Sequence, residues 1–325
     1  MRVLERAVRL ILRRVTATLA VGAALGCGGS EAADRPQQVA NAKPAEASVE
    51  FDGAKAMDYL RAQLAFGARV PGTAAHRSAG DWLVREFGAR ADTVIVQSWT
   101  HTAADGKRLP MRNVLARFNP SATRRVLYLA HWDSRPRAEK ALDPARRALP
   151  VPGANDGASG VAVLLALADV LKANPTAIGV DLLLVDGEDW GDFDTDTDVL
   201  IGAKYFATHF PEPGYAPEFG VLFDMVGKPG AQFLYESHSV RAAPEVIQRV
   251  WSTAARIGHD QYFPTREYGP IADDHVPLIA AGLKVIDVID IEYDYHHTPE
   301  DTEDKVSQRT LQVVGDVALA VIRGM

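Results

Sequence analysis

The feature that most limits how this chain can fold is a repeated alternation of short apolar segments and longer helical patterns. Residues 125–130 (RVLYLA) and 180–185 (VDLLLV) are largely apolar, and residues 219–223 and 284–291 are similar short runs. Apolar runs of this length are typical of strands that are buried on both faces of a sheet. Residues 160–171 (GVAVLLALADVL) lie between the first two runs and predict a helix that is apolar on most of its surface. Strands that alternate with helices predict an α/β fold with a largely parallel sheet.

Further segments of the chain complete this arrangement. Residues 93–98 and 111–118 have the pattern of additional strands. Amphipathic or helix-like patterns are found at residues 54–66, 75–89, 198–210, 245–257 and 305–322. We therefore expect a three-layer α/β sandwich, with a mixed, largely parallel central sheet and helices on both faces.

The N-terminal segment differs from the rest of the chain. Residues 1–14 contain five arginines and one acid, and residues 15–26 are apolar and small. This order predicts a secretory signal peptide over residues 1–26, because the apolar run is shorter than a membrane span. Cys27, the only cysteine, follows Ala24-Leu25-Gly26, and this segment resembles a bacterial lipoprotein processing site. The resemblance implies an exported bacterial protein, periplasmic or membrane-anchored through a lipid on Cys27; the alternative is a lone cysteine in an ordinary signal or core helix.

The residues after Cys27 predict a tether and then one folded domain. Residues 27–50 are rich in Gly, Ala, Ser, Pro and charge without apolar periodicity, which predicts a flexible tether. The folded pattern starts at Phe51 and predicts a single domain over residues 51–325. The net charge of −7 excludes the basic surface of a nucleic-acid-binding protein. The sequence defines no oligomeric state.

Acids and histidines follow each strand candidate directly. His131 and Asp133 follow the first buried run, and Glu188 and Asp189 lie just after the second. Further acids and histidines of this kind are Asp156, Asp186, Asp224, Asp273, Asp274, His275, His296 and His297. Each alone has an ordinary explanation, such as a helix cap for Asp156, a turn for Asp186 or Asp224, or a structural histidine for His131. Together they are expected to meet, because functional sites in open α/β sheets form at the carboxyl ends of the strands.

Several carboxylates at one edge of a sheet require a positive partner. Their mutual repulsion and their desolvation cost free energy unless a cation neutralises them. A divalent metal would do so, and carboxylates with imidazoles and without thiolates suit a catalytic zinc ion. Glu188 beside Asp189 suggests that one carboxylate binds the metal while its neighbour transfers protons.

Five ordered motifs and the Asp224 strand end resemble the M28 zinc peptidase family, from about residue 52 to the C-terminus. The motifs are HWD at 131–133, GANDGASG at 153–160, GED at 187–189, DDH at 273–275 and HHTPEDT at 296–302. For a peptidase of this family, the resemblance implies two zinc ions, an aminopeptidase activity and Glu188 as the residue that activates water. His131 and Asp224 would then bind one ion, Asp189 and His297 the other, and Asp156 both.

The glutaminyl cyclase branch of the family is the more similar one. DDH at 273–275, FDMVGKPGAQF at 223–233 and NPSATRRVLYLAHWDSRP at 119–136 resemble cyclase segments. This resemblance implies one zinc ion, bound by Asp156, Asp189 and His297. Glu188 would be the catalytic acid and base, with Asp224 and Asp273 (or Asp274 as the alternative) in its proton network. The implied substrates are peptide or protein N-termini, whose glutamine becomes pyroglutamate with release of ammonia.

The sequence departs from the cyclase pattern at two positions. His296 stands where cyclases usually have Trp, so we expect Trp190 and His296 at the substrate pocket, with Tyr293 or Tyr295 as alternative walls. The HisThrPro context favours His297 over His296 as the ligand. Asp189 replaces the Glu of the animal enzymes and is still a competent ligand.

Three other interpretations are weaker. Alternating acids at 192–198 resemble a calcium loop, but the sixth position is Thr197 and the twelfth is Ala203, which fails the EF-hand pattern. A non-catalytic binding domain would typically have lost ligands or the base, and all of these residues are present. A serine hydrolase based on Ser159 lacks the expected elbow context.

Overall fold

The computed structural model describes residues 49–325. The predicted signal peptide over residues 1–26, the lipidation site at Cys27 and the tether up to residue 48 lie outside the described residues. Within residues 49–325, none of the helices combines the length and the apolar character needed to span a bilayer.

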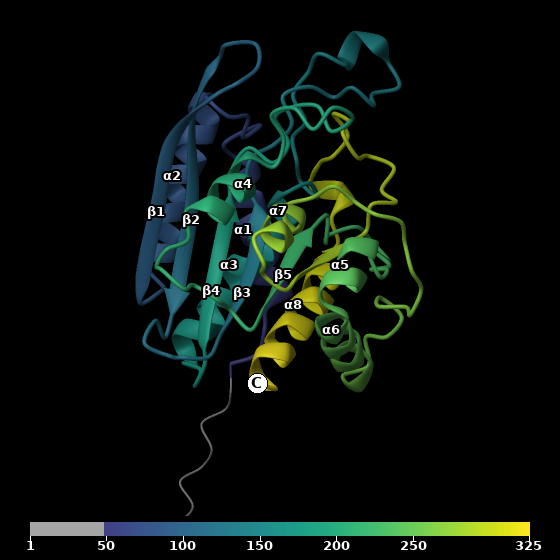
Figure 1. Ribbon diagram of the computed structural model, residues 1–325. Helices are drawn as coiled ribbons and strands as arrows, with labels where there is room; N and C mark the ends of the chain where they lie inside the picture. The colour runs from purple at the N-terminus through teal and green to yellow at the C-terminus, as the bar shows by residue number, and fades with distance from the viewer. Residues whose placement is uncertain (1–48) are drawn as a thin grey trace, which may run out of the picture. The chain divides into compact units, whose positions relative to one another are not determined.

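The centre of the described domain is a six-stranded mixed sheet with the strand order β1-β2-β4-β3-β5-β6. The pair β1–β2 and the pair β2–β4 are antiparallel, whereas β4, β3, β5 and β6 run parallel to one another. The strands are β1 (Thr93–Thr102), β2 (Arg108–Phe118), β3 (Arg125–His131), β4 (Gly179–Val185), β5 (Phe219–Asp224) and β6 (Val285–Ile289). The expected mixed, largely parallel sheet is confirmed, and an antiparallel hairpin forms its one edge (Figure 1).

Helices cover both faces of this sheet (Figure 1). One face packs against α1, α2, α3, α6 and α8, and the other packs against α4 and α7. The helices are α1 (Gly53–Leu64), α2 (Ala74–Gly88), α3 (Ala158–Ala173), α4 (Ile201–Thr208), α5 (Ser237–Ala242), α6 (Pro244–Arg256), α7 (His275–Ala280) and α8 (Gln308–Arg323), with short 3-10 turns at Pro144–Arg146 and Glu303–Lys305. The expected three-layer sandwich is therefore confirmed.

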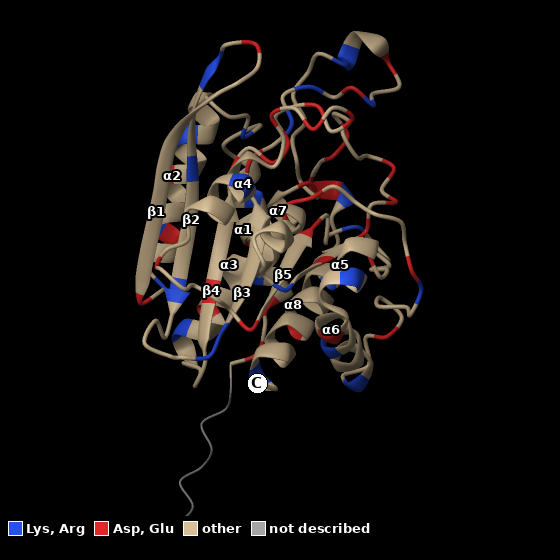
Figure 2. Ribbon diagram, viewed as in Figure 1, with Lys and Arg blue, Asp and Glu red and all other residues tan. Residues whose placement is uncertain are grey.

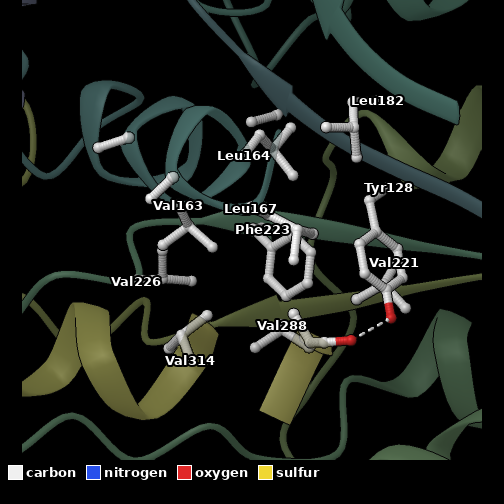
Figure 3. Close-up of a cluster of buried hydrophobic side chains, with 14 of the residues drawn as sticks. Tyr128, Val163, Leu164, Leu167, Leu182, Val221, Phe223, Val226, Val288 and Val314 are labelled. Atoms are coloured by element: carbon white, nitrogen blue, oxygen red, sulfur yellow. Dashed lines mark hydrogen bonds between the residues drawn. The ribbon is translucent and has the colours of Figure 1, made fainter. Parts of the chain in front are cut away.

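The core explains why the central strands are apolar almost throughout. In β3, Tyr128 faces the larger helical layer, while Leu127 and Leu129 face α4 and α7. Strands β4 and β5 alternate in the same way, so both faces of the sheet are buried. Tyr128 is fully buried beside Phe223, and its hydroxyl donates a hydrogen bond to the Ala318 carbonyl of α8 (Figure 3).

A close approach of α3 to β5 brings two functional loops together. A Cβ atom on Gly160 would lie 2.0 Å from the Phe223 carbonyl oxygen, so only glycine permits this contact. Asp156 directly precedes α3, and Asp224 directly follows Phe223 at the end of β5. The packing of α3 therefore fixes these two carboxylates beside each other.

Candidate metal centre and active site

Acids and histidines meet at the edge formed by the carboxyl ends of the parallel strands. His131 ends β3, Asp224 ends β5, and Glu188 and Asp189 lie just after β4. Figure 2 shows acidic residues along the loops above these strand ends, with basic residues among them. The predicted meeting of these side chains at one edge is thus observed.

His131 lies between two of the candidate ligands. Its Nε2 atom is 3.1 Å from Asp156 Oδ1 and 3.1 Å from Asp224 Oδ1, and its side chain is fully buried. Its Nδ1 atom is 3.5 Å from Asp133 Oδ1. Burial lowers the pKa of His131, but Asp224, Asp133 and Asp156 outweigh burial and raise it well above the usual value.

His297 and Asp189 form a second part of the site. The Nε2 atom of His297 lies 3.3 Å from Asp189 Oδ1 and 3.8 Å from Asp156 Oδ2. Arg135 donates to the same Asp189 Oδ1 at 2.8 Å, whereas Asp189 Oδ2 is buried without a hydrogen-bond partner. Glu139 contacts the other ring nitrogen of His297, at 2.7 Å. The Asp189 carboxylate therefore has one buried oxygen that no protein group binds within residues 49–325.

The loop that carries Asp156 is held by Asp301. The buried Asp301 carboxylate accepts hydrogen bonds from the backbone N–H groups of Asn155 (2.9 Å) and Asp156 (3.2 Å) and from the Tyr293 hydroxyl (2.7 Å). Helix α3 has Gly157 at its N-cap and no capping side-chain hydrogen bond, so Asp156 does not serve as a helix cap. Its carboxylate is free to face His131 and His297.

Glu188 is a buried carboxyl group among other acids. Its backbone N–H donates a hydrogen bond to Asp133, and the residue as a whole is 5% exposed. Burial raises the pKa of Glu188 well above its usual value; His131 opposes this shift, and Asp189 and Asp273 add to it. A carboxyl group with a raised pKa suits a residue that both accepts and returns a proton.

The DDH motif contributes further buried acids behind Glu188. Burial, followed by repulsion from Asp224, raises the pKa of Asp273 to about 7. Both carboxylate oxygens of Asp274 are buried without hydrogen-bond partners, and burial and Asp273 raise its pKa well above the usual value. His275 does not line the cavity, and its Nε2 atom contacts Glu236 at 3.0 Å. Glu188, Asp224 and Asp273 thus lie in one electrostatically coupled group.

The site opens into a cavity of about 610 Å³. Asp156, Glu188, Asp224, Asp273, His296 and His297 are among its lining residues, together with apolar side chains that the sequence did not point to, namely Phe193, Met225, Ile271, Ile289 and Ile291. Trp190 lines a neighbouring hollow with Lys107 and packs beside Met111 and Ile201. Tyr293 and Tyr295 pack against each other beside Met225 and Ile289.

The acidic loop at residues 192–198 is engaged with the protein itself. Asp198 contacts His101 at 2.7 Å and accepts from the Ala104 N–H, and Asp196 pairs with Lys204 at 2.8 Å. Asp192 and Asp194 line the cavity. These contacts indicate that the loop has a structural role, with two of its acids at the cavity, and they do not favour a calcium site.

The donor set of the site fits a zinc ion. Within residues 49–325, ligand atoms of His131, Asp156 and Asp224 lie within 4.8 Å of one another, and so do those of Asp156, His296 and His297. These groups are imidazoles and carboxylates, buried except for the partly exposed His296, and such side chains are the usual ligands of catalytic zinc. A third group of this kind is Asp273, His275 and Asp287, all of them buried, and its Asp273 also lines the cavity.

Comparison with known proteins supports this interpretation. The family model of peptidase family M28 matches residues 113–322. A glutaminyl-peptide cyclotransferase-like protein from Mus musculus is 32% identical over 226 residues, which cover 60% of this chain and 55% of the mouse protein. The structure of Porphyromonas gingivalis glutaminyl cyclase is similar with a TM-score of 0.82 and 37% identity, over 84% of this chain and 98% of that one. A Zn-dependent exopeptidase from Parabacteroides distasonis gives a TM-score of 0.83 and 36% identity, over 86% and 100%.

The chain belongs to peptidase family M28. The family and the described fold agree with a zinc-dependent enzyme that has either the cyclase or the exopeptidase activity of its structural neighbours.

Proposed function

We propose that this protein is a zinc-dependent glutaminyl-peptide cyclotransferase that converts N-terminal glutamine of peptides or proteins to pyroglutamate. The observation that carries the proposal is the buried carboxyl group of Glu188 at the wall of the cavity, whose pKa is raised by burial and by Asp189, Asp273 and Asp274. The 37% identity with a bacterial glutaminyl cyclase over most of the chain supports the same conclusion.

The proposed reaction is an intramolecular amide exchange. The α-amine nitrogen of the substrate attacks its own side-chain amide carbon, a new N–C bond closes the five-membered ring, and the amide C–N bond breaks. Glu188 accepts the proton of the attacking amine and donates it to the leaving nitrogen, so that the leaving group is ammonia. In this proposal Asp224 and Asp273 form the proton network of Glu188, since Asp273 raises the pKa of Glu188 and Asp224 raises that of Asp273. The cavity holds the two reacting groups of the substrate together, which supplies much of the rate enhancement.

Asp156, Asp189 and His297 are the proposed zinc ligands for this reaction. The unpartnered Oδ2 of Asp189 and the close approach of His297 Nε2 to both carboxylates support this choice. A zinc ion, when bound, supplies a Lewis acid that polarises the amide carbonyl. Apolar cavity residues such as Phe193, Ile271 and Ile291 would exclude water that competes with the amine.

An M28 aminopeptidase with two zinc ions is the second candidate. The observation that favours it is the contact of His131 Nε2 with both Asp156 and Asp224, at 3.1 Å each. His131 and Asp224 would then bind a second ion, Asp156 would bind both ions, and Glu188 would act on water.

Mass spectrometry of two peptides distinguishes the candidates. Purified zinc-loaded protein is given a peptide that begins with glutamine and an otherwise equal peptide that begins with leucine. The proposal predicts loss of ammonia from the first peptide while the second stays intact. Release of leucine from the second peptide would move the protein to the aminopeptidases and give His131 a ligand role.

We also propose that the protein is exported and anchored through a lipid on Cys27. The basic and apolar order of residues 1–26 and the Ala24-Leu25-Gly26-Cys27 segment support this proposal. Mass spectrometry of the N-terminal peptide of membrane-fraction protein tests it, because an unmodified Cys27 would contradict the anchor.

A further inference from the structure

The two adjacent histidines of the cavity are held by a single short segment of a distant loop. Glu139 Oε1 lies 2.7 Å from Nδ1 of His297, and the next residue, Lys140, places its Nζ 3.0 Å from Nδ1 of His296. The backbone N–H of Lys140 also donates to the His297 carbonyl, at 3.3 Å. His297 has a left-handed backbone conformation, with φ of 56°, which is uncommon for a residue with a side chain. The segment at Glu139 and Lys140 therefore fixes both the turn and the rings it carries.

The two ring contacts have opposite chemistry. A carboxylate only accepts hydrogen bonds, so the Nδ1 atom of His297 must carry the hydrogen that Glu139 binds. An ammonium group only donates, so the Nδ1 atom of His296 must present its lone pair to Lys140. A neutral imidazole carries one hydrogen, and therefore the hydrogen of His296 lies on Nε2.

The other ring nitrogens face the candidate ligands. Nε2 of His297 is 3.3 Å from Asp189 Oδ1 and 3.8 Å from Asp156 Oδ2. Nε2 of His296 is 3.9 Å from the same Asp156 oxygen. By distance to Asp156 alone the two histidines are equivalent, so the hydrogen positions decide which of them binds a metal.

We propose that Glu139 and Lys140 are positioning residues that set opposite tautomers on His297 and His296, so that only His297 is a metal ligand. Because the contact with Glu139 keeps a hydrogen on Nδ1, Nε2 is the atom of His297 that is left to bind a metal, with Glu139 holding the ring and raising its basicity. His296 keeps its Nε2–H as a hydrogen-bond donor at the cavity wall, at the position where cyclases usually have Trp.

Arg135 links this arrangement to the second ligand. It donates to Glu139 at 2.7 Å and to Asp189 Oδ1 at 2.8 Å. Arg135, Glu139, His297 and Asp189 thus form a closed ring of polar contacts that brings two candidate ligands from different loops together. The inference rests on the zinc site of the proposed function and holds for one ion or two.

The first measurement is the tautomer of each histidine by long-range ¹H–¹⁵N NMR on zinc-loaded protein at one pH. We expect His297 to show an Nδ1–H and a metal-bound Nε2, and His296 to show an Nε2–H. The variants His296→Asn and His297→Asn assign the signals. An Nδ1–H on His296 or a metal shift on its Nε2 would overturn the proposal.

The second measurement is zinc affinity by competition with a chelator. Glu139→Leu removes the acceptor and is expected to weaken zinc binding about 10- to 100-fold, which is typical for loss of a partner that orients a ligand. Glu139→Gln keeps an acceptor oxygen and should recover part of this loss. Lys140→Met should leave the zinc affinity within about twofold of the unchanged protein. In the NMR spectrum of this variant, His296 should no longer be predominantly the tautomer with the hydrogen on Nε2.

Glu300→Leu is the matched control. Glu300 pairs with Arg146 and also joins this loop to the segment after the histidines, but it contacts neither ring. We expect its zinc affinity to equal that of the unchanged protein. Thermal melts in EDTA establish whether each variant folds. If Glu139→Leu does not fold, the zinc affinity of Glu139→Gln decides whether Glu139 positions His297.

The outcomes separate this proposal from the proposed function. If the unchanged protein binds zinc and Glu139→Leu binds it equally well, the tautomer proposal is wrong and the zinc site stands. If the unchanged protein binds no stoichiometric zinc, the zinc site of the proposed function fails together with this inference.

Discussion

Replacement of Tyr293 by Phe tests how the loop of Asp156 is held in place. The Tyr293 hydroxyl donates a hydrogen bond of 2.7 Å to Asp301 Oδ1 in the buried interior. The same carboxylate accepts the backbone N–H groups of Asn155 and Asp156. Tyr293→Phe removes one of these three donors and changes no other heavy atom, so its effect reports on the Asp301 carboxylate alone.

The loss of stability in Tyr293→Phe depends on pH, because the charge of Asp301 depends on pH. Burial, followed by repulsion from Asp156, raises the pKa of Asp301 to about 7, and the Tyr293 hydroxyl opposes this shift. The folded state thus holds the proton more tightly than the unfolded chain, whose Asp has a pKa of about 3.9. The contribution of Asp301 to the free energy of unfolding therefore falls as the pH rises from about 4 to about 7. The Phe variant raises the pKa further, so its stability continues to fall above pH 7.

These relations give two expected magnitudes. Near pH 5, Asp301 is protonated in both folded proteins, and the variant loses a neutral hydrogen bond that contributes about 0.5–1.5 kcal/mol. Near pH 8.5 the carboxylate is charged, and the loss is about 1.5–3 kcal/mol. For a domain of this size the loss at high pH corresponds to a Tm lower by roughly 3–5 °C.

Thermal melts in EDTA at both pH values measure these differences. Tyr295→Phe is the control, because the Tyr295 ring packs against Tyr293 at 5.5 Å while its hydroxyl makes no hydrogen bond within residues 49–325. We expect its Tm to change by less than about 1 °C, as for surface changes. Equal losses for Tyr293→Phe at pH 5 and pH 8.5 would refute the role given to the Asp301 charge.

Four further predictions test the site, the fold and the anchor. Glu188→Gln should lower turnover about 100- to 10,000-fold at near-normal zinc content, and substantial remaining activity would remove Glu188 from the mechanism. Asp181→Asn leaves Arg117 and Arg125, at 3.2 and 2.8 Å, without their buried charged partner. It should therefore cost about 3–5 kcal/mol in melts without changing zinc affinity. Zinc at about 100 times its Kd should raise the stability of the apo protein by about 2.7 kcal/mol, so an unchanged Tm in EDTA would contradict a zinc site. Cys27→Ser should move the protein from the membrane fraction to the soluble fraction, and unchanged fractionation would contradict the anchor.

The sequence predicted the central strands well because their apolar runs have one physical explanation. The run at 125–130 became β3 (Arg125–His131), whose residues are buried throughout. The run at 180–185 became β4 (Gly179–Val185), with the same burial. A segment that must be buried on both faces of a sheet cannot contain many polar residues, so such strands are visible from composition alone.

Short helices and polar strand ends were not predictable in the same way. Helices α5 (Ser237–Ala242) and α7 (His275–Ala280) have six residues each, which is too short for a helical period to be recognised. Strands β1 and β2 extend beyond the expected runs, to Thr102 and from Arg108, through mixed polar and apolar residues without a clear alternation. Their ladder hydrogen bonds hold them in the sheet, and Trp99 and Leu109 pack in a small cluster that only the tertiary structure forms.

The site was predictable where it followed the strand ends and not where it depended on loops. His131, Asp189 and Asp224 follow strands, so the rule for parallel sheets located them. Arg135 and Glu139 lie in a long loop without periodicity. Their spacing of four residues and their opposite charges were the only signal, and such pairs are common on protein surfaces.

The acidic side chains at the carboxyl ends of the strands have few buried cations to neutralise them. Arg69 is fully buried nearby, but its guanidinium donates hydrogen bonds to the backbone carbonyls of Trp132, Pro152 and Gly153. Burial lowers the pKa of Arg69 to about 10 against the attraction of Asp133, Asp301 and Asp156.

The guanidinium of Arg69 is therefore engaged by carbonyl groups, and burial and mutual repulsion raise the pKa values of Glu188, Asp273 and Asp274, which favours their protonated forms in the apo protein. A bound divalent ion would replace part of that proton charge. Zinc affinity should consequently increase with pH, because binding must release the protons that the acids share.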